Sequence, residues 1–557
     1  MFWDREQEMD ALERAYARPE GQLVVIYGRR RVGKTALIRE FGRGKPVIFF
    51  LADRQIETVQ RMGLRREMAA VYPAAGRLEP TWDNLLGFIA EQSAREGSKL
   101  VLVLDEFQYL AQSNPAVPSI LQRLWDMQLH ERNLMLILCG SLVGMMFDTC
   151  LSYSSPLFGR RTGALKLKPL RFHQVRQIFA AWPFDEVVRL YAVTGGVPHY
   201  IRMLGVTPDA EPGDIIRRLE QTVFQPSDLL YDEPRFILSG ELAEPITYFS
   251  ILQAIAAGEH RLGKIAGALA VQTNRITRYL NVLTELDLVE RRVPVTVALP
   301  TRTRRGLWTI TDHFFRFWFR YVFPNQGDLE MGRTDEVLRQ VRQTFESQFV
   351  AAAFEDVCAD LVMSRSFSLP FHPLKVGGWW DKNAEIDLVA LNDETGEILF
   401  GECKWTEQPV GMDVLQHLYA ASRRVKWHND SRREWFAIFS RAGFQDELIA
   451  RAQRPGDVGH RDVLLIQEGG QVCKSANQQV CKSASLQVSR CLLVSLSPLL
   501  PLSPSPYSHS GSSSLPVTFC HRAGNSSLTC SLKATMNSAT LTASAACICT
   551  SVDRDSR

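Results

Sequence analysis

Three short apolar runs near the start of the chain predict strands that are buried on both faces. They span residues 23–27, 99–104 and 133–139, and residues 35–41 have the spacing of an amphipathic helix. Continuous apolar strands are typical of parallel sheets that helices cover on both sides, whereas an apolar residue at every third or fourth position indicates a helix. The pattern therefore predicts an α/β fold that begins with a parallel sheet.

The pattern changes to a compact helical module near residue 241. Pro245 suits the first turn of a helix, where its missing N–H leaves no intrahelical partner unpaired. Three segments with helical spacing and then two strands are expected at residues 246–257, 261–269, 274–286, 288–297 and 305–310. This order of three helices and a hairpin is that of a winged helix.

A second, smaller α/β unit is predicted between residues 345 and 439. The expected elements are a helix with Glu355, a turn and strand over residues 379–390, a strand over residues 399–405, a helix that begins near residue 415 and a strand over residues 435–439. Polar side chains interrupt the apolar pattern of its first two strands, which makes these strands candidates for chemistry.

Composition limits the partners and the compartment. The 557 residues include 64 Lys and Arg against 61 Asp and Glu, a formal net charge of +3, so any nucleic-acid surface has to be local. No apolar run reaches the about 18 residues that a membrane helix needs, and the first residues do not resemble a signal peptide. Most of the cysteines follow residue 470, and those before it lack zinc-site spacing. We expect a reduced, cytoplasmic protein without a membrane partner.

The residues between the first strand and the first helix match G-x-x-x-x-G-K-[ST]. They are Gly28, Arg29, Arg30, Arg31, Val32, Gly33, Lys34 and Thr35. In such a P-loop the glycines let backbone N–H groups face phosphates at a helix N-terminus. Lys34 is expected to reach the β and γ phosphates, and the Thr35 hydroxyl to ligand Mg²⁺. A nucleoside triphosphate is therefore the predicted ligand of these eight residues.

The second strand ends in Asp105 and Glu106, as a Walker B motif does. At the carboxyl end of a parallel strand, Asp105 can hold Mg²⁺ through water and Glu106 can polarise the attacking water. Ser141 follows the third strand and is expected beside the γ-phosphate, with a plain turn serine as the alternative. Arg160 is either a surface arginine or neutralises transition-state charge, in cis or from a neighbouring subunit of a homo-oligomer.

The smaller α/β unit carries a candidate metal site. Glu402 and Lys404 share one strand face because side chains alternate along a strand, and Asp387 on the neighbouring strand can converge with them. Two carboxylates can hold Mg²⁺ or Mn²⁺, while the lysine orients or activates water against a phosphodiester. Gln416 on the following helix could support the site. A charged strand face would produce the same pattern without any chemistry.

The helical module offers a surface for double-stranded DNA. The residues expected at the start of its third helix and at the tip of its wing are Thr273, Asn274, Arg275, Arg278, Arg302, Arg304 and Arg305. There they could meet DNA phosphates, although winged helices also dock proteins. The aromatic run over residues 314–321 is expected to pack in a core rather than to stack on bases, because its rings crowd around a helix.

The motifs together resemble those of archaeal-type P-loop ATPases of the STAND/AAA-related group, which carry a C-terminal domain similar to PD-(D/E)XK nucleases. The matching segments are residues 27–35, 104–110, 156–160, 195–198, 385–387 and 402–405. The resemblance covers nearly all of residues 1–470. It implies ATP rather than GTP, and an ATPase core followed by a winged helix.

Five parts of the chain are expected. They are a P-loop ATPase domain (1–200), a helical lid (201–240), a winged helix (241–325), a PD-(D/E)XK nuclease-like domain (335–469) and a low-complexity tail (470–557). The tail begins with an eight-residue repeat whose first six positions are identical, and the Ser-, Leu- and Pro-rich remainder predicts disorder.

These features favour an ATP-hydrolysing switch or motor coupled to a nuclease-like effector. Three classes compete: an ATPase that regulates DNA cleavage, an ATP-driven regulator whose nuclease-like domain only binds DNA or a protein partner, and a nucleotide-gated scaffold without hydrolysis. Glu106 favours hydrolysis. The spacing of the other residues does not separate the first two classes.

Overall fold

The computed structural model describes residues 3–242, 244–303, 305–453 and 462–467, and the backbone of five short strands after residue 470. The chain divides into two units, Met1–Ser483 and Ala484–Arg557. The second unit contains two antiparallel pairs, β14 (Phe519–Ala523) with β15 (Ser526–Cys530) and β16 (Thr535–Asn537) with β17 (Thr540–Thr542). The rest of the predicted tail lies outside the described residues, as does Arg304.

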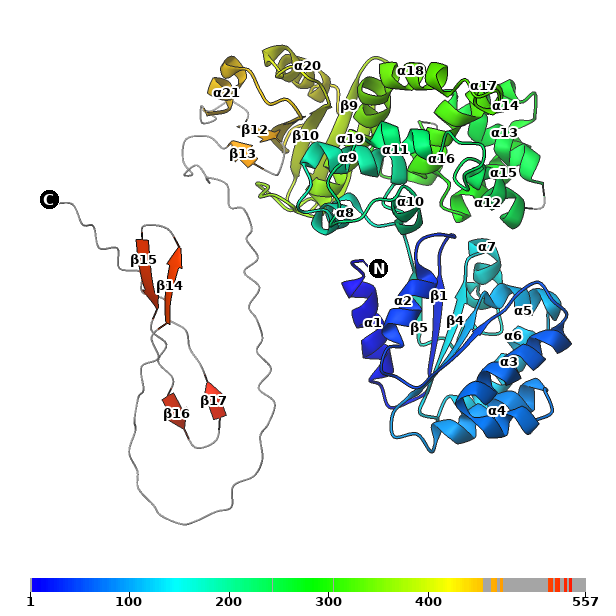
Figure 1. Ribbon diagram of the computed structural model, residues 1–557. Helices are drawn as coiled ribbons and strands as arrows, with labels where there is room; N and C mark the ends of the chain where they lie inside the picture. Colours follow the sequence, from blue (N-terminus) through cyan, green and yellow to red (C-terminus); the bar gives the residue numbers. More distant parts are fainter. Residues whose placement is uncertain are drawn as a thin grey trace. The chain divides into compact units, whose positions relative to one another are not determined.

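The first region of the larger unit is a parallel sheet with helices on both faces (Figure 1). The strand order is β2-β3-β4-β1-β5. Its elements are α1 (Glu6–Tyr16), β1 (Gln22–Tyr27), α2 (Lys34–Phe41), β2 (Val47–Leu51), α3 (Glu57–Val71), η1 (Pro73–Arg77), α4 (Trp82–Ser93), β3 (Leu100–Asp105), α5 (Phe107–Ser113), α6 (Val117–Leu124), η2 (Trp125–Leu129), β4 (Leu134–Gly140), α7 (Val143–Met146), η3 (Phe147–Leu151) and β5 (Gly163–Lys166). The predicted α/β fold with a parallel sheet is confirmed.

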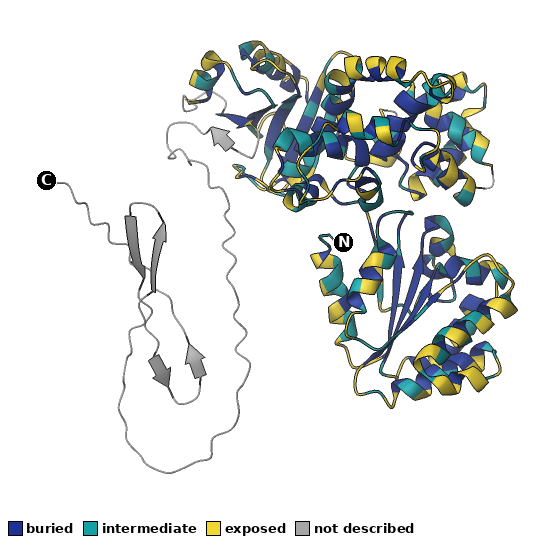
Figure 2. Cartoon of the chain, viewed as in Figure 1, coloured by how far each residue is buried: buried dark blue, intermediate teal, exposed yellow. Residues whose placement is uncertain are grey.

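Alternate residues of one strand serve two separate cores in this region. Leu23 and Val25 pack on the face covered by α3, α4 and α6, whereas Val24 and Ile26 pack on the face covered by α1 and α2. The three central strands β1, β3 and β4 are almost wholly buried (Figure 2). Because both faces are covered, every position of the strand has to be apolar. The polar residues that follow β1, β3 and β4 are thereby placed together at the carboxyl edge of the sheet.

A helical region follows the parallel sheet. Its elements are α8 (Phe172–Ile178), α9 (Phe184–Thr194), α10 (Pro198–Met203), α11 (Ile215–Gln221), α12 (Glu233–Glu241), α13 (Pro245–Ala256), α14 (Leu262–Ala268), α15 (Thr273–Glu285), β6 (Val289–Arg292), η4 (Pro300–Arg302), β7 (Leu307–Ile310), α16 (His313–Phe317), η5 (Trp318–Val322), η6 (Phe323–Asn325), α17 (Gln326–Glu330), α18 (Thr334–Thr344), η7 (Phe345–Val350) and α19 (Ala351–Met363). The three helices and the antiparallel hairpin predicted between residues 246 and 310 are all present, as α13 to α15, β6 and β7.

The hairpin is shorter than the sequence predicted. The first strand pairs only up to Arg292, and the second strand pairs from Leu307 onward. We expected longer strands, over residues 288–297 and 305–310. The connecting loop pairs with the C-terminal sheet instead: the Val295 N–H donates to the Gly378 carbonyl at 3.0 Å. Backbone groups that bond to another sheet cannot continue the hairpin ladder, so the strand prediction was too long.

The C-terminal region is a mixed six-stranded sheet in the order β13-β12-β11-β10-β9-β8. Its elements are β8 (Lys375–Trp380), β9 (Glu385–Asn392), β10 (Glu397–Lys404), α20 (Met412–Ser422), β11 (Arg433–Ser440), α21 (Asp446–Gln453), β12 (Asp462–Gln467) and β13 (Gln471–Cys473). The segment expected as one turn and strand over residues 379–390 is in fact the end of β8 and most of β9, which pair antiparallel. α19 packs on one face of the sheet, and α20 and α21 pack on the other.

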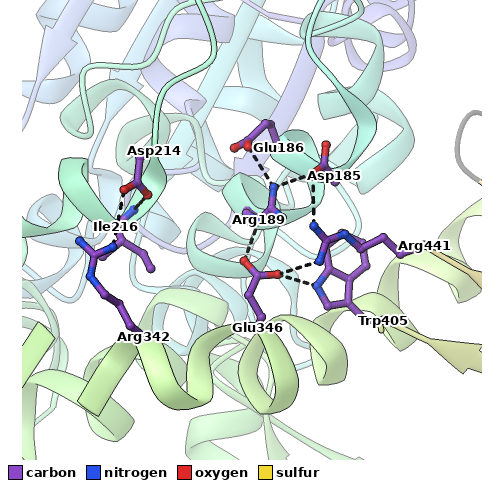
Figure 3. Close-up of polar contacts among 9 residues, drawn as sticks. All are labelled: Asp185, Glu186, Arg189, Asp214, Ile216, Arg342, Glu346, Trp405 and Arg441. Carbon is purple, nitrogen blue, oxygen red and sulfur yellow. Dashed lines mark hydrogen bonds and ion pairs between the residues drawn. The ribbon is translucent and has the colours of Figure 1, made fainter. Parts of the chain in front are cut away.

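A cluster of charged side chains joins the helical region to the ends of two C-terminal strands (Figure 3). Arg189 on α9 donates to the Glu346 carboxylate at 2.7 Å, and Trp405 donates its indole N–H to the same carboxylate at 2.8 Å. Arg441 lies 3.5 Å from Glu346 and 3.7 Å from Asp185. Since Trp405 follows β10 and Arg441 follows β11, these contacts fix the carboxyl ends of both strands against α9.

The aromatic run over residues 314–321 packs in the core of the helical region, as predicted. Phe314, Phe315, Phe317 and Trp318 are each 0 % exposed. The Phe317 ring lies 5.1–6.4 Å from four other aromatic rings, in edge-on or tilted arrangements that suit aromatic quadrupoles. These rings are therefore unavailable for stacking on nucleic-acid bases.

We expect Phe317→Ala to lower the free energy of unfolding by about 3–5 kcal/mol, because it removes a fully buried ring and leaves a cavity. Tyr153→Ala is the matched control, since that ring is 89 % exposed and its loss should change stability by less than about 0.5 kcal/mol. Urea unfolding followed by tryptophan fluorescence measures both. Equal midpoints for the two variants would contradict the assignment of Phe317 to the core.

Candidate functional site

The P-loop connects the end of β1 to the first residue of α2. Gly28 (φ 152°) and Gly33 (φ 96°) both occupy backbone conformations that favour glycine. A Cβ on Gly28 would also overlap the carbonyl oxygen of Leu167, whereas space is open around Gly33. The loop therefore needs its first glycine for both close packing and conformation, and its second for conformation alone.

Lys34 and Thr35, the last two residues of the loop motif, make the contacts expected of a phosphate-binding loop. The Lys34 ammonium donates to the carbonyl oxygens of Gly28 at 2.7 Å and of Arg29 at 2.9 Å, so it lies within the curve of the loop. The Thr35 hydroxyl donates to the Asp105 carboxylate at 2.9 Å. The first and second motifs of the sequence are thus joined by a direct hydrogen bond, with the oxygen atoms that suit Mg²⁺ side by side.

Glu106 and Ser141 form a second polar contact at the same edge. Glu106 adopts a left-handed backbone (φ 54°) just before α5. Its carboxylate accepts hydrogen bonds from the Ser141 hydroxyl at 2.9 Å, from the Ser141 N–H at 3.2 Å and from the Gln108 amide. Ser141 therefore orients Glu106, and the two side chains reach the cavity together.

These residues line a cavity of about 760 Å³, a volume suited to a nucleotide. Its basic side chains are Arg30, Arg31, Lys34, His199 and Arg202, and its remaining lining includes Trp3, Thr35, Glu106, Ser141 and Phe236. An ammonium, guanidinium groups and a hydroxyl–carboxylate pair in one cavity fit a polyphosphate with its Mg²⁺.

Two of the basic residues come from α10 and were missed by the sequence analysis. His199 and Arg202 lie one helical turn apart, directly after the Gly195-Gly196-Val197-Pro198 turn. Two basic residues at positions i and i+3 after this Gly-Gly-x-Pro turn are the sequence signal that could have identified them. Trp3 and Phe236 gave no such signal, because their contact with the cavity depends on distant segments.

The three arginines of the P-loop point to three different elements. Arg29 is buried and pairs with Asp312 just before α16. Arg30 donates to the Tyr109 hydroxyl at 3.1 Å, and Arg31 pairs with Glu233 of α12 at 2.8 Å. Because a buried carboxylate takes its guanidinium, Arg29 can face a nucleotide only through its backbone, and its assignment as a nucleotide-binding residue stays a prediction. It lies outside the cavity lining. Gly28 and Val32 are likewise outside the cavity lining, and Val32 is 0 % exposed.

Arg160 lies apart from this cavity. Its guanidinium donates to the Asp126 carboxylate at 2.9 Å, and its side chain is 35 % exposed. The structure does not bring it to Glu106 or to Lys34 within the same chain. Transition-state stabilisation in cis is thus unsupported, while contribution to a neighbouring subunit stays a prediction.

The candidate residues of the C-terminal sheet do converge. The Lys404 ammonium lies 2.7 Å from the Glu402 carboxylate and 3.7 Å from the Asp387 carboxylate. Asp387 also accepts a hydrogen bond from the Cys403 N–H at 2.9 Å, which ties β9 to β10. Lys404 therefore bridges the two carboxylates. Gln416 is exposed on α20, and its supporting role stays a prediction.

Burial and like charge perturb the carboxylates of this site. Burial, with the nearby Asp387 charge, raises the pKa of Glu355 on α19 to about 8. The same two causes raise the pKa of Glu402. Among the described residues, no three His, Cys, Asp or Glu side chains are arranged to hold a metal ion. The carboxylates of this site therefore repel each other, and a bound cation would relieve that repulsion. The described side chains do not form a ready-made metal centre.

The parallel sheet, the loop between β1 and α2 and the acidic residues after β3 define a P-loop nucleotide-binding protein. Residues 2–204 match a family described as an ATPase domain predominantly from Archaea. Residues 318–417 match a family described as archaeal and bacterial proteins of unknown function.

Relatives of known sequence agree with this class. An uncharacterized protein of Methanocaldococcus jannaschii, MJECL04, is 34 % identical over 409 residues, which cover 73 % of this chain and 88 % of that protein. An uncharacterized ATP-binding protein of the same organism, MJ0423, is 45 % identical over 47 residues, 8 % of this chain and 80 % of that protein. The chain therefore belongs to the same family as MJECL04, and its residues 2–204 are an ATPase domain of archaeal type.

Solved structures with some likeness to the chain include the Walker-type ATPase PABY2304 of Pyrococcus abyssi, with a TM-score of 0.45 and 22 % identity over 57 % of this chain and 96 % of that chain. The Aeropyrum pernix ORC2 protein has a TM-score of 0.39 and 14 % identity over 61 % of this chain and 95 % of that chain.

Within the described part of the chain, no helix is both long and apolar enough to cross a bilayer.

His199 gives a test of polyphosphate binding. Burial, together with the charges of Arg31 and Arg202, lowers the pKa of His199 to about 4. A polyphosphate in the cavity supplies the opposite charge and should raise that pKa, so binding at about pH 6 takes up protons. By linkage, the contribution of His199 to affinity grows as the pH falls.

Calorimetry of ATP binding in two buffers with different ionisation enthalpies measures this proton uptake. His199→Asn should reduce it by a sizeable fraction of one proton, and the difference between the two proteins removes the ionisation of the nucleotide itself. Identical proton uptake in both proteins would show that His199 does not face the phosphates.

Proposed function

We propose that this chain binds ATP with Mg²⁺ and hydrolyses it as a nucleotide-controlled switch or motor. The observation that carries the proposal is the contact between Thr35 and Asp105, beside Lys34 and Glu106 in one cavity. A P-loop and an acidic strand end could each arise as a structural feature alone. The hydrogen bond between their side chains, beside Lys34 and Glu106, supports one shared ligand site.

Each residue of the cavity then has a distinct task. Lys34 binds the β and γ phosphates, and Thr35 with Asp105 holds Mg²⁺, which neutralises charge on the phosphates. Glu106 orients and polarises the attacking water, held in place by Ser141. The Arg160 side chain is 35 % exposed and pairs with Asp126, and we propose that it can be donated to a neighbouring subunit of a homo-oligomer.

Two substitutions separate binding from turnover. Lys34→Ala should abolish ATP binding, because it removes the charge that contacts the phosphates. Glu106→Gln should retain ATP but lower kcat by about 1,000-fold or more, because the amide cannot polarise water. Equilibrium binding of labelled ATP and a phosphate-release assay measure the two effects. Equal ATP affinity in the wild-type protein and in Lys34→Ala would remove the site assignment.

The helical module is proposed to act as a winged helix that contacts double-stranded DNA. The residues expected to meet phosphates at the start of α15 are exposed: Thr273, Asn274, Arg275 and Arg278. Arg302 and Arg305 in the loop of the hairpin are exposed as well. A second use of the module is protein docking, which the same exposure permits.

The C-terminal domain is proposed to be a PD-(D/E)XK nuclease-like effector. Support comes from the convergence of Asp387, Glu402 and Lys404, and from the raised pKa of Glu355 on the helix that packs against them. Crowded acids of this kind are characteristic of sites that bind cations. The alternative is a regulator or scaffold whose nuclease-like domain only binds DNA or a protein partner.

Cleavage of plasmid DNA separates these alternatives. With an active site, Mg²⁺ or Mn²⁺ supports nicking that Asp387→Ala and Glu402→Ala each eliminate while ATP turnover continues. Lys404→Ala should impair cleavage more than DNA binding, because its proposed task lies in the transition state. Glu397→Ala, an acid elsewhere on β10, is the matched control. If neither metal supports nicking, and if these substitutions leave the affinity for DNA unchanged, the results would favour the regulator.

A further inference from the structure

Arg31 lies between a buried carboxylate and the nucleotide cavity. Its guanidinium donates to both oxygens of Glu233, at 2.8 Å and 3.2 Å. The Glu233 side chain is only 4 % exposed, whereas the Arg31 side chain is 34 % exposed and lines the cavity beside Lys34. The same cation therefore neutralises Glu233 and faces the place where phosphates are expected.

The Arg31 backbone is held in an unusual conformation. Its φ of 74° lies in the left-handed region, which a side chain with a Cβ adopts at an energetic cost. The adjacent residues of the loop explain why the cost is tolerated: Gly33 also has a positive φ, and Lys34 bonds back to the carbonyls of the loop. Arg31 is thus projected from the curve of the P-loop rather than along α2.

Glu233 begins α12, and this helix borders the cavity. Phe236 on its next turn lines the cavity while remaining 61 % exposed. At the other end of α12, Arg54 donates to the Gly240 carbonyl at 2.9 Å. Burial raises the pKa of Glu233 despite the opposing charge of Arg31. Loss of Arg31 would leave a nearly buried, unpaired carboxylate, which disfavours the present position of α12.

We propose that the terminal phosphate of ATP competes with Glu233 for Arg31, so that ATP releases the first turn of α12 and ADP does not. A guanidinium forms the same two-point hydrogen bonds with phosphate as with carboxylate. The inference rests on the proposed binding of ATP in this cavity. Arg31 is then the residue that distinguishes ATP from ADP. Its competing partner Glu233 sets the ratio of the two affinities.

The other two P-loop arginines make different contacts from Arg31. Arg29 is 9 % exposed, and its partner Asp312 is 0 % exposed, so that pair is shielded from the cavity. Arg30 donates to the Tyr109 hydroxyl of α5 at 3.1 Å, and its charge lowers the pKa of Glu233 less than the contact with Arg31 does. Arg31 both pairs with a nearly buried carboxylate and lines the cavity, so a ligand that takes its guanidinium changes the balance between two conformations.

Hydrogen exchange of the full-length protein tests the release directly. With a non-hydrolysable ATP analogue, AMP-PNP, the amides of residues 233–241 should exchange about tenfold faster than with ADP. Peptides of α3, which does not contact Arg31, provide the internal reference. Equal protection of α12 by both nucleotides, or greater protection with AMP-PNP, would overturn the proposal.

Affinities of three variants test the competition. Glu233→Gln should bind AMP-PNP about tenfold more tightly than the wild type, with ADP affinity unchanged, because the competing charge is gone. Arg31→Gln should lose most of the preference for AMP-PNP over ADP. Arg54→Gln is the control: it removes a different contact of α12 and should leave the ratio of the two affinities unchanged.

The outcomes separate this inference from the proposed function. A wild-type protein that binds neither nucleotide would overturn ATP binding itself and this inference with it. A protein that binds both nucleotides, but whose Glu233→Gln variant gains affinity equally for each or for neither, would overturn the competition alone. The hydrogen-exchange measurement uses the wild-type protein alone. It therefore tests the release of α12 even if one of the variants misfolds.

Discussion

The buried ion pair between Arg29 and Asp312 is the contact on which the arrangement of the larger unit depends. Arg29 belongs to the P-loop, whereas Asp312 stands at the N-terminus of α16, where it also accepts a hydrogen bond from the Phe315 N–H at 3.0 Å. Removing one partner of such a pair leaves a buried charge without compensation, at a cost of about 3–5 kcal/mol. The Arg29 side chain therefore anchors the P-loop to Asp312 in the helical region. Because the pair is buried, a shift of one part displaces the other.

The short helix α16 extends this contact toward the C-terminal sheet. Arg316 and His313 on α16 lie 3.3 Å and 3.5 Å from the Asp356 carboxylate, and Arg292 lies 2.7 Å from it. Burial opposes ionisation of Asp356, but the Arg292 charge, a hydrogen bond from His313 and the Arg316 charge hold the pKa of Asp356 well below its usual range. The neighbouring residue on α19 is Glu355, whose pKa is raised by burial and by the nearby Asp387 charge. The short helix α16 is thus tied at one end to the P-loop through Asp312 and along its length to α19 through Asp356. The proposed ATPase and effector therefore share a structural frame.

The position of the basic residues on α10 depends on the two glycines before it. Gly195 and Gly196 both have positive φ, and a Cβ on Gly196 would overlap the Leu170 carbonyl oxygen. With that close approach, Pro198 starts α10 directly after the turn, and His199 and Arg202 face the cavity. The Gly-Gly-x-Pro turn is therefore a constraint on charge placement. Without it, the cavity would keep its P-loop cations but lose those that face them from the helical region.

The sequence by itself determined the parallel sheet, the P-loop and the acidic strand end, because these features depend on local periodicity and on a short run of residues with fixed backbone demands. Apolar positions 23–27 have to be a strand covered on both faces, and Gly28 and Gly33 have to bracket a tight loop. It also brought Asp387, Glu402 and Lys404 close, because adjacent strands share a face. Only the tertiary structure decided where side chains meet across long separations. Arg29 lies 283 positions from Asp312 and Arg31 lies 202 from Glu233, so no spacing rule reveals that one P-loop arginine is a buried anchor while another faces the cavity.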